Sequence, residues 1–266
     1  MNTRILFLGE TVGKPGMTAI KKGLQGLKEA QRVDFTVANG EGLSNGFGIS
    51  QAHAVQLLKT GVDVITTGEK TYYKKDMVEA IQKISRLIRP ANFPAGNPGR
   101  GFKTIKIGEL NVGFITLLGT AGFNRITVTN PFIHATSLVS KLSQECDSVI
   151  LQFHASTTAE ESTMAFHLDG KVAAVIGTHS KVLTSDARLL PKGTAFITDN
   201  GMCGSIDGVG GFDAEPEIKR FIDQIPSRSQ NGNGSLELQG AIVELDQRGA
   251  AVSIEPIQYP VQGGAQ

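Results

Sequence analysis

The sequence predicts an α/β fold in which helices pack against a mixed β-sheet. Short apolar runs recur along the 266 residues, and each ends in a cluster of glycine and polar residues. Most of these runs are rich in β-branched residues and lack polar alternation, which is typical of strands buried on both faces. Helical patterns separate several of the runs, and strand–helix alternation favours a layered α/β architecture.

The individual elements can be read from these patterns. Seven runs are predicted as strands: Arg4–Gly9, Phe35–Asn39, Val62–Thr67, Val112–Leu118, Ser148–Phe153, Ala173–Gly177 and Thr194–Thr198. Five stretches are predicted as helices: Met17–Ala30, Ser50–Lys59, Lys75–Ile84, Ile133–Gln144 and Glu160–His167. Ser50 is a suitable N-cap for the second helix, because its hydroxyl can accept a hydrogen bond from a first-turn amide.

Two antiparallel hairpins are also predicted, and they make the sheet mixed. The hairpins are Lys103–Ile107 with Val112–Leu118, and Leu236–Leu245 with Ala251–Ile257. No sequence feature marks a boundary between domains, so we expect a single domain over residues 1–260. Residues 227–235 read as a flexible loop and residues 261–266 as a flexible tail.

Composition excludes several classes of protein. Lys and Arg (26) nearly balance Asp and Glu (25), so no global charge favours nucleic acid or an anionic membrane. Cys146 and Cys203 lie far apart without metal-binding spacing and are expected to be free thiols. No apolar run approaches the ~20 residues of a membrane span, and no secretory leader is recognisable. We therefore expect a cytoplasmic protein without a membrane span.

Carboxylate and imidazole side chains follow five of the predicted strands. They are Glu10, Glu41, Glu69, His154 and His179. Each alone is more often a solvated, capping or structural residue than a ligand. Because sites in open α/β sheets form beyond the carboxyl ends of the strands, we expect these side chains to converge. Mixed carboxylates and imidazoles are typical ligands of transition metals.

The strand ends and two further segments, Arg89–Pro94 and Leu190–Ala195, resemble the YmdB-like branch of the calcineurin-like metallophosphoesterases. The resemblance runs along nearly the whole chain. It implies the calcineurin-like fold, in which mixed β-sheets are layered as a sandwich flanked by helices. It also implies a two-metal centre and a link to 2′,3′-cyclic nucleotide phosphodiesterase activity.

One of the two metal positions departs strongly from the family pattern. The family uses an Asp after the first strand, a bridging Glu, the Asn beyond it, and the last His of a Gly-Thr-His-x-His run. The matching residues here are Glu10, Glu41, Gly42 and Lys181. Glu10 is a weak candidate ligand, Gly42 has no side chain, and a protonated lysine has no lone pair to donate.

The other metal position keeps four candidate ligands, which are Glu41, Glu69, His154 and His179. The resemblance therefore implies either no metal or one divalent ion, Zn²⁺, Fe²⁺ or Mn²⁺, and a two-metal centre is not expected. Asp186 and Asp199 match family positions that can hold the ligands in place from behind.

Lys70 stands where the family has the His that protonates the leaving group. An ordinary lysine titrates near pH 10.4, so it is poorly matched to act as a general acid at neutral pH. Lys70 and Lys181 together carry the formal charge of one divalent ion. We expect them to compensate Glu10, Glu41 or Glu69, since an unpaired buried carboxylate is very unfavourable.

Three hypotheses for function follow. The first is a catalytically impaired or inactive relative with a binding, assembly or regulatory role, and the sequence leans towards this non-enzyme. The alternative is a mononuclear metal-dependent phosphodiesterase or phosphatase acting on cyclic nucleotides or other phosphoesters. The third is a module kept for its surface. A homo-oligomer, an unidentified protein partner and a phosphate-containing ligand are all compatible with the sequence.

Overall fold

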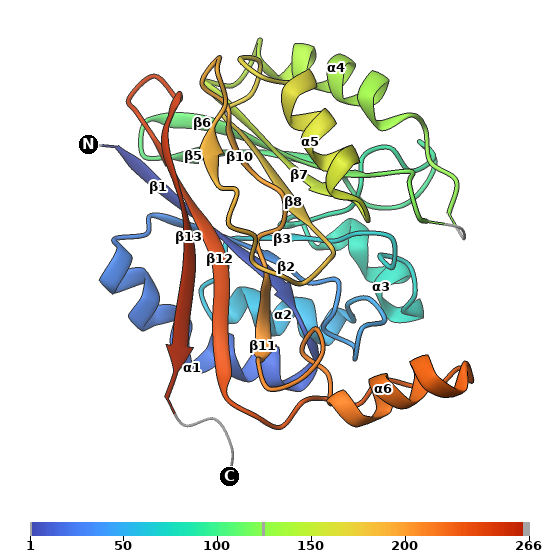
Figure 1. The fold of residues 1–266 in the computed structure, drawn as a ribbon. Coiled ribbons are helices and arrows are strands. Elements are labelled where there is room, and N and C mark those ends of the chain that lie inside the picture. The colour runs from blue at the N-terminus through green and yellow to red at the C-terminus, as the bar shows by residue number, and fades with distance from the viewer. Residues whose placement is uncertain (1, 124–125, 263–266) are drawn as a thin grey trace.

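A computed structural model describes residues 2–123 and 126–262 (Figure 1). Two mixed β-sheets face each other, and helices cover the outer face of each sheet. This arrangement confirms the predicted sandwich of mixed sheets flanked by helices. It brings the carboxyl ends of parallel strands from both sheets to one edge of the molecule.

The first sheet has seven strands in the order β13-β12-β11-β1-β2-β3-β4. Their bounds are β1 Thr3–Thr11, β2 Phe35–Asn39, β3 Val64–Thr66, β4 Leu87–Ile88, β11 Met202–Ser205, β12 Leu236–Leu245 and β13 Ala251–Val261. Strands β11, β1, β2, β3 and β4 run parallel, whereas β12 is antiparallel to β1, β11 and β13. The expected closing hairpin is therefore confirmed.

The second sheet has six strands in the order β5-β6-β7-β8-β10-β9. Their bounds are β5 Phe102–Ile107, β6 Leu110–Leu118, β7 Ser148–His154, β8 Ala174–Thr178, β9 Arg188–Leu189 and β10 Ala195–Ile197. Strands β6, β7, β8 and β10 are parallel, and β5 and β9 form antiparallel edges. The predicted hairpin across Gly108 is confirmed as β5 and β6.

The helices are α1 Gly13–Gln31, α2 Gln51–Lys59, α3 Lys75–Ala80, α4 Pro131–Leu142, α5 Thr158–His167 and α6 Ala214–Asp223, with a 3₁₀ turn η1 at Ile81–Lys83. The Ser50 side chain accepts a hydrogen bond from the amide of His53, which confirms it as the N-cap of α2. The helix expected over Lys75–Ile84 is divided into α3 and η1.

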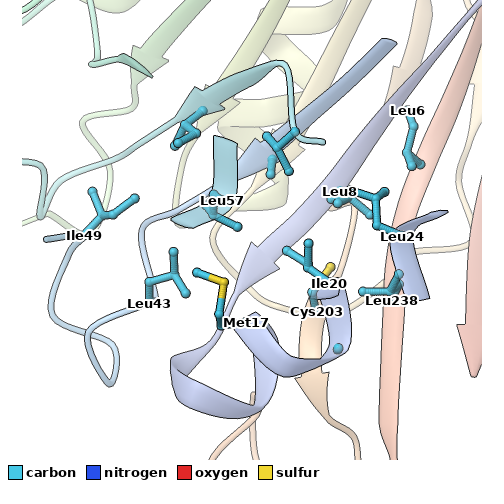
Figure 2. Close-up of a cluster of buried hydrophobic side chains, with 14 of the residues drawn as sticks. Leu6, Leu8, Met17, Ile20, Leu24, Leu43, Ile49, Leu57, Cys203 and Leu238 are labelled. Atoms are coloured by element: carbon cyan, nitrogen blue, oxygen red, sulfur yellow. The ribbon is translucent and has the colours of Figure 1, made fainter. Parts of the chain in front are cut away.

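Alternation along the strands divides the interior into layers. Leu6 and Leu8 of β1 pack against α1 and α2, in the cluster drawn in Figure 2. Ile5 and Phe7 of the same strand point the other way, into the core between the two sheets. A third cluster joins the second sheet to α4 and α5. The sheets are thus buried on both faces, as their uninterrupted apolar runs predict.

Several features lie outside the sequence predictions. No element was predicted at β4, β9, β11 or α6. Val261, the first residue of the expected tail, ends β13, and residues 263–266 lie outside the described residues. Both cysteines are free, as expected. Within the described part of the chain, no helix is long and apolar enough to cross a membrane.

Candidate metal centre

The predicted site residues meet where strands of the two sheets end. Glu10 lies in β1, Glu41 follows β2, Glu69 follows β3, His154 ends β7 and His179 follows β8. Buried hydrogen bonds join the two sheets just behind them. Asn39 Nδ2 donates to Thr178 Oγ1 at 2.8 Å, and Thr66 Oγ1 donates to Gln152 Oε1 at 2.8 Å. The relative position of the two sets of strand ends is therefore held by side chains as well as by packing.

Glu69, His154 and His179 form a compact group of potential ligands. One donor atom from each side chain lies within 4.8 Å of the others. His154 Nε2 is 2.6 Å from Glu69 Oε2 and 3.2 Å from His179 Nδ1, and the last atom is 3.9 Å from Glu69 Oε2. The sequence-predicted residues after three separate strands are thus brought together at one point.

The protonation of this group is set by burial and by its own charges. Burial opposes ionisation of Glu69, but the positive charge and hydrogen bond of His154, with Lys70, outweigh it and lower the Glu69 pKa. Burial also opposes a charged His154, yet Glu69 outweighs it and raises the His154 pKa. Burial and then the charge of His154 lower the pKa of His179 to about 3. His179 is therefore neutral at pH 7, and its unprotonated ring nitrogen keeps a lone pair that it can donate to a metal ion.

Local backbone geometry makes the close approach of these groups possible. A Cβ atom on Gly68 would meet the imidazole ring of His154, so a glycine is required before Glu69. His179 has φ of 133°, and Lys181 has φ of 61°, both in a region that residues with a side chain seldom adopt. Strain of this kind is concentrated at functional sites, because the surrounding structure must hold it in place.

Glu41 is buried beside this group but is engaged by backbone amides. Its Oε2 accepts a hydrogen bond from Gly68 N at 2.7 Å, and its Oε1 accepts one from Lys70 N. Burial, followed by the charge of Glu69, raises the pKa of Glu41 to about 8. The three-residue group of ligand atoms does not include Glu41. Its role as a metal ligand stays a prediction.

Glu10 and Lys181 form an ion pair at the other predicted metal position. Glu10 is 1% exposed, and Lys181 Nζ lies 3.2 Å from its Oε1. Neither carboxylate oxygen of Glu10 accepts a hydrogen bond from the residues that the structure describes, so the lysine is its principal compensation. A Cβ atom on Gly42 would lie 2.7 Å from Glu10 Oε1 and 2.8 Å from Thr11 O. The longer carboxylate therefore occupies space that a side chain at position 42 would need.

Lys70 pairs with Glu69 on the solvent side of the group. Its Nζ lies 3.2 Å from Glu69 Oε1. Burial favours the neutral amine, but Glu69, Glu10 and Glu41 outweigh it and raise the Lys70 pKa. Lys70 is consequently a fixed positive charge at neutral pH and an unsuitable proton donor.

The two aspartates expected behind the ligands differ in position. Asp199 accepts hydrogen bonds from Ser180 N at 2.7 Å and from Gly201 N at 2.8 Å, which orders the turn that carries His179. Asp186 instead accepts hydrogen bonds from Thr184 and Thr198. Asp199 therefore holds the backbone next to His179, whereas Asp186 stabilises the neighbouring loop.

Phe123 borders the site and was not identified from the sequence. Its ring stacks near His154, with centroids 6.0 Å apart, and meets His179 edge-on at 5.0 Å. It follows β6, so reading the residues beyond Leu118 in the same way as the other strand ends would have found it. The aromatic ring therefore lies beside both imidazoles.

The donor chemistry fits one metal ion better than two. Once His154 gives up the proton that Glu69 stabilises, Glu69, His154 and His179 offer a carboxylate and two neutral imidazoles, a set that suits Zn²⁺, Fe²⁺ or Mn²⁺. The second position offers Glu10, already paired with an ammonium group, and no side chain at Gly42. These residues do not fit a second cation.

A sandwich of two mixed sheets with carboxylates and imidazoles at its strand ends defines a metallophosphoesterase-type protein. The chain belongs to the YmdB-like protein family, whose profile matches residues 6–257. A 2′,3′-cyclic-nucleotide 2′-phosphodiesterase from Bacillus subtilis is 38% identical over 96% of both chains. Two crystal structures match the fold of this chain with a TM-score of 0.90 each. One, described as a novel phosphatase from Mycoplasma pneumoniae, is 30% identical and covers 98% of this chain and 94% of its own. The other, a hypothetical protein from Thermus thermophilus, is 29% identical, and the match covers 97% of this chain and 100% of that protein.

These similarities bear on the functional hypotheses. The family uses divalent metals, and Glu69, His154 and His179 form a candidate site for one. The relatives are named as a phosphodiesterase or a phosphatase. Their names favour the alternative of an active phosphoesterase over the loss of catalysis that the sequence suggested first.

Proposed function

We propose that this protein is a phosphoesterase that uses a single divalent metal ion and acts on phosphodiesters such as 2′,3′-cyclic nucleotides. The observation that carries the proposal is the convergence of Glu69, His154 and His179 within 4.8 Å. The ammonium groups of Lys70 and Lys181 lie beside this centre. The similarity to a cyclic-nucleotide phosphodiesterase supports the choice of substrate class.

The proposed roles follow from the charges. A bound ion would polarise the phosphoryl group and lower the pKa of a coordinated water molecule. Lys181 supplies positive charge where the family resemblance implies a second ion, and Lys70 supplies it where the family has its proton-donating His, so both bind the non-bridging phosphate oxygens. Glu10 orients Lys181 through their ion pair, and Glu69 does the same for Lys70.

This arrangement lacks a matched general acid, and that lack predicts a leaving-group preference. The raised pKa of Lys70 keeps its proton bound at neutral pH. Nitrophenolate departs without receiving a proton, whereas a ribose hydroxyl needs one. We expect bis-p-nitrophenyl phosphate to be hydrolysed faster than 2′,3′-cyclic AMP, by roughly the 10²–10⁴-fold that general acid catalysis supplies.

The test combines metal analysis with turnover. Protein purified without chelators and supplied with Mn²⁺ should bind about one equivalent of metal and hydrolyse bis-p-nitrophenyl phosphate. His154→Ala and His179→Ala should lose both properties. His134→Ala, a half-buried histidine on α4, is the matched control and should keep them. Two equivalents of tightly bound metal, or turnover unaffected by both site variants, would contradict the proposal.

A second candidate is a protein that binds a phosphate-containing ligand without turning it over. It is favoured by the two ion pairs, because Lys70 and Lys181 compensate Glu69 and Glu10 without a cation. This candidate predicts no stoichiometric metal and no turnover. It also predicts that inorganic phosphate or 2′,3′-cyclic AMP protects the protein against unfolding, and that Lys181→Met abolishes the protection.

A further inference from the structure

A cavity of about 470 Å³ lies between α1, α2 and the segment that precedes α3. Its size is within the range of roughly 300–1,000 Å³ that small-molecule sites occupy. Met17 and Leu43 are buried and form the apolar part of its lining (Figure 2). Among the described residues that line it, none belongs to the candidate metal centre. The cavity is therefore a separate site.

Three lysines line the cavity without a partner of opposite charge. Lys14 and Lys21 lie two turns apart on one side of α1, and the half-buried Lys74 directly precedes α3. In the part of the chain that the structure describes, none of the three forms an ion pair, and no aspartate or glutamate lines the cavity. The nearby carboxylate of Asp76 instead accepts a hydrogen bond from Gln51 N at 2.9 Å. The cavity consequently carries three uncompensated positive charges.

Neutral polar groups complete the lining. His53 Nδ1 lies 3.3 Å from Ser44 Oγ, and Asn45 and Gln56 add two carboxamides. Burial, followed by the charge of Lys74, lowers the pKa of His53, so its ring is uncharged at pH 7. Hydroxyl, imidazole and carboxamide groups can both donate and accept hydrogen bonds. The cavity therefore combines cations with groups that can bind an uncharged polar part of the same ligand.

We propose that this cavity binds a small molecule with a chain of linked phosphate groups, such as a nucleoside triphosphate or inorganic tripolyphosphate. Lysine ammonium groups form charge-assisted hydrogen bonds with phosphate oxygens. The seven residues from Lys14 to Lys21 span about 10 Å along the axis of α1. This separation fits an extended anion better than a single phosphate, and the three positive charges match its several negative ones. Such binding is independent of phosphoester hydrolysis, because no candidate metal ligand contributes to the cavity.

The segments that line the cavity continue from the loops of the metal centre. Leu43–Asn45 begin two residues after Glu41, and Lys74 follows Lys70 by four residues. A ligand in the cavity would therefore contact both loops without occupying the metal centre. This is the position of a regulatory ligand and not that of a substrate.

Isothermal titration calorimetry on the full chain in EDTA tests the proposal, because EDTA keeps metal out of the other site. Tripolyphosphate and ATP should each bind with about one equivalent, and inorganic phosphate should bind at least about 10-fold more weakly. Lys14→Met and Lys74→Met should each weaken tripolyphosphate binding about 10-fold. Lys59→Met, an exposed lysine on α2 outside the cavity, is the matched control and should leave binding unchanged, as should Lys70→Met at the metal centre. Tighter binding of ATP than of tripolyphosphate would identify a nucleotide as the ligand, and equal affinity would identify an inorganic chain.

Histidine resonances locate the ligand independently of these variants. Bound phosphate groups should raise the pKa of His53 by about 1 in an NMR titration, because negative charge favours the imidazolium and offsets the charge of Lys74. The pKa of the half-buried His134 on α4 should not change. Equal affinity for inorganic phosphate and tripolyphosphate would overturn the proposal, as would binding that survives Lys74→Met or is lost in Lys70→Met or Lys59→Met. Absence of saturable binding, or a His53 pKa that the ligand leaves unmoved, would overturn it equally.

Discussion

Replacement of Lys181 by methionine should show how strongly the stability of the fold depends on a positive charge beside the buried Glu10. Lys181 Nζ is 3.2 Å from Glu10 Oε1, and the Glu10 side chain is almost fully buried. At the effective dielectric constant of ~20 that suits protein sites, two unit charges at this separation attract by about 5 kcal/mol. Lys181 keeps some exposure, so we expect Lys181→Met to destabilise the protein by about 3 kcal/mol, mainly through an uncompensated Glu10.

The assay is a double-mutant cycle measured by urea unfolding. Circular dichroism is the suitable probe, because the chain contains no tryptophan. Glu10→Gln combined with Lys181→Met should recover most of the stability lost in Lys181→Met. Lys106→Met is the matched control. Its Nζ is 3.3 Å from Glu109 Oε2 in an exposed pair, so its loss should stay below about 1 kcal/mol.

Two further outcomes separate an unpaired charge from lost packing. The deficit of Lys181→Met should be smaller at pH 5 than at pH 8, because an unpaired buried carboxylate takes up a proton as the pH falls. Saturating Mn²⁺ should restore part of the stability, since a cation can take the place of the ammonium group. A loss equal to that of Lys106→Met, or additive effects of the two site substitutions, would refute the idea that Lys181 compensates Glu10.

Three other predictions follow from neighbouring residues. Burial, with the charges of Asp199 and Asp186, raises the pKa of Glu161 to about 10. The folded state therefore favours the protonated side chain, and the stability that protonated Glu161 contributes is lost as the pH rises from about 4.5 towards 10. Glu161→Gln should remove that slope and add on the order of 2 kcal/mol at pH 8, and equal urea midpoints at pH 8 would contradict this. Phe123→Ala should cost about 1 kcal/mol and speed metal release from the histidines at unchanged stoichiometry, measured by chelator competition. Gly42→Ala should destabilise the fold by about 1–3 kcal/mol in urea unfolding, with partial recovery when Glu10 is shortened to Asp.

Much of the fold could be predicted because the strands are uninterrupted apolar runs. The predicted bounds of Phe35–Asn39 agree with β2, and both hairpins were located from their flanking turns. The short strands β4 and β9 contain two residues each, and such segments carry no periodicity to detect. Helix α6 was missed although Asp213 caps it, because its apolar stripe is brief and lies between glycine-rich loops.

The convergence of Glu69, His154 and His179 could also be predicted. Each follows a parallel strand, and the carboxyl ends of such strands share one edge. The ion-pair partners of Lys70 and Lys181 could not be predicted, because the sequence left Glu10, Glu41 and Glu69 as equal candidates. Distances decide that question, and side-chain reach across two sheets is a tertiary property.

The sequence by itself determined that Glu10, Gly42 and Lys181 stand where the family resemblance implies metal ligands, because residue type at a matched position is read directly from the chain. Only the tertiary structure decided how these residues are accommodated. Lys181 compensates Glu10, the longer Glu10 fills the space beside Gly42, and backbone amides engage Glu41. The exposure of Ile218, Phe221 and Ile222 on α6 was likewise undetermined, since an amphipathic pattern shows which residues share a side of a helix but not what that side meets.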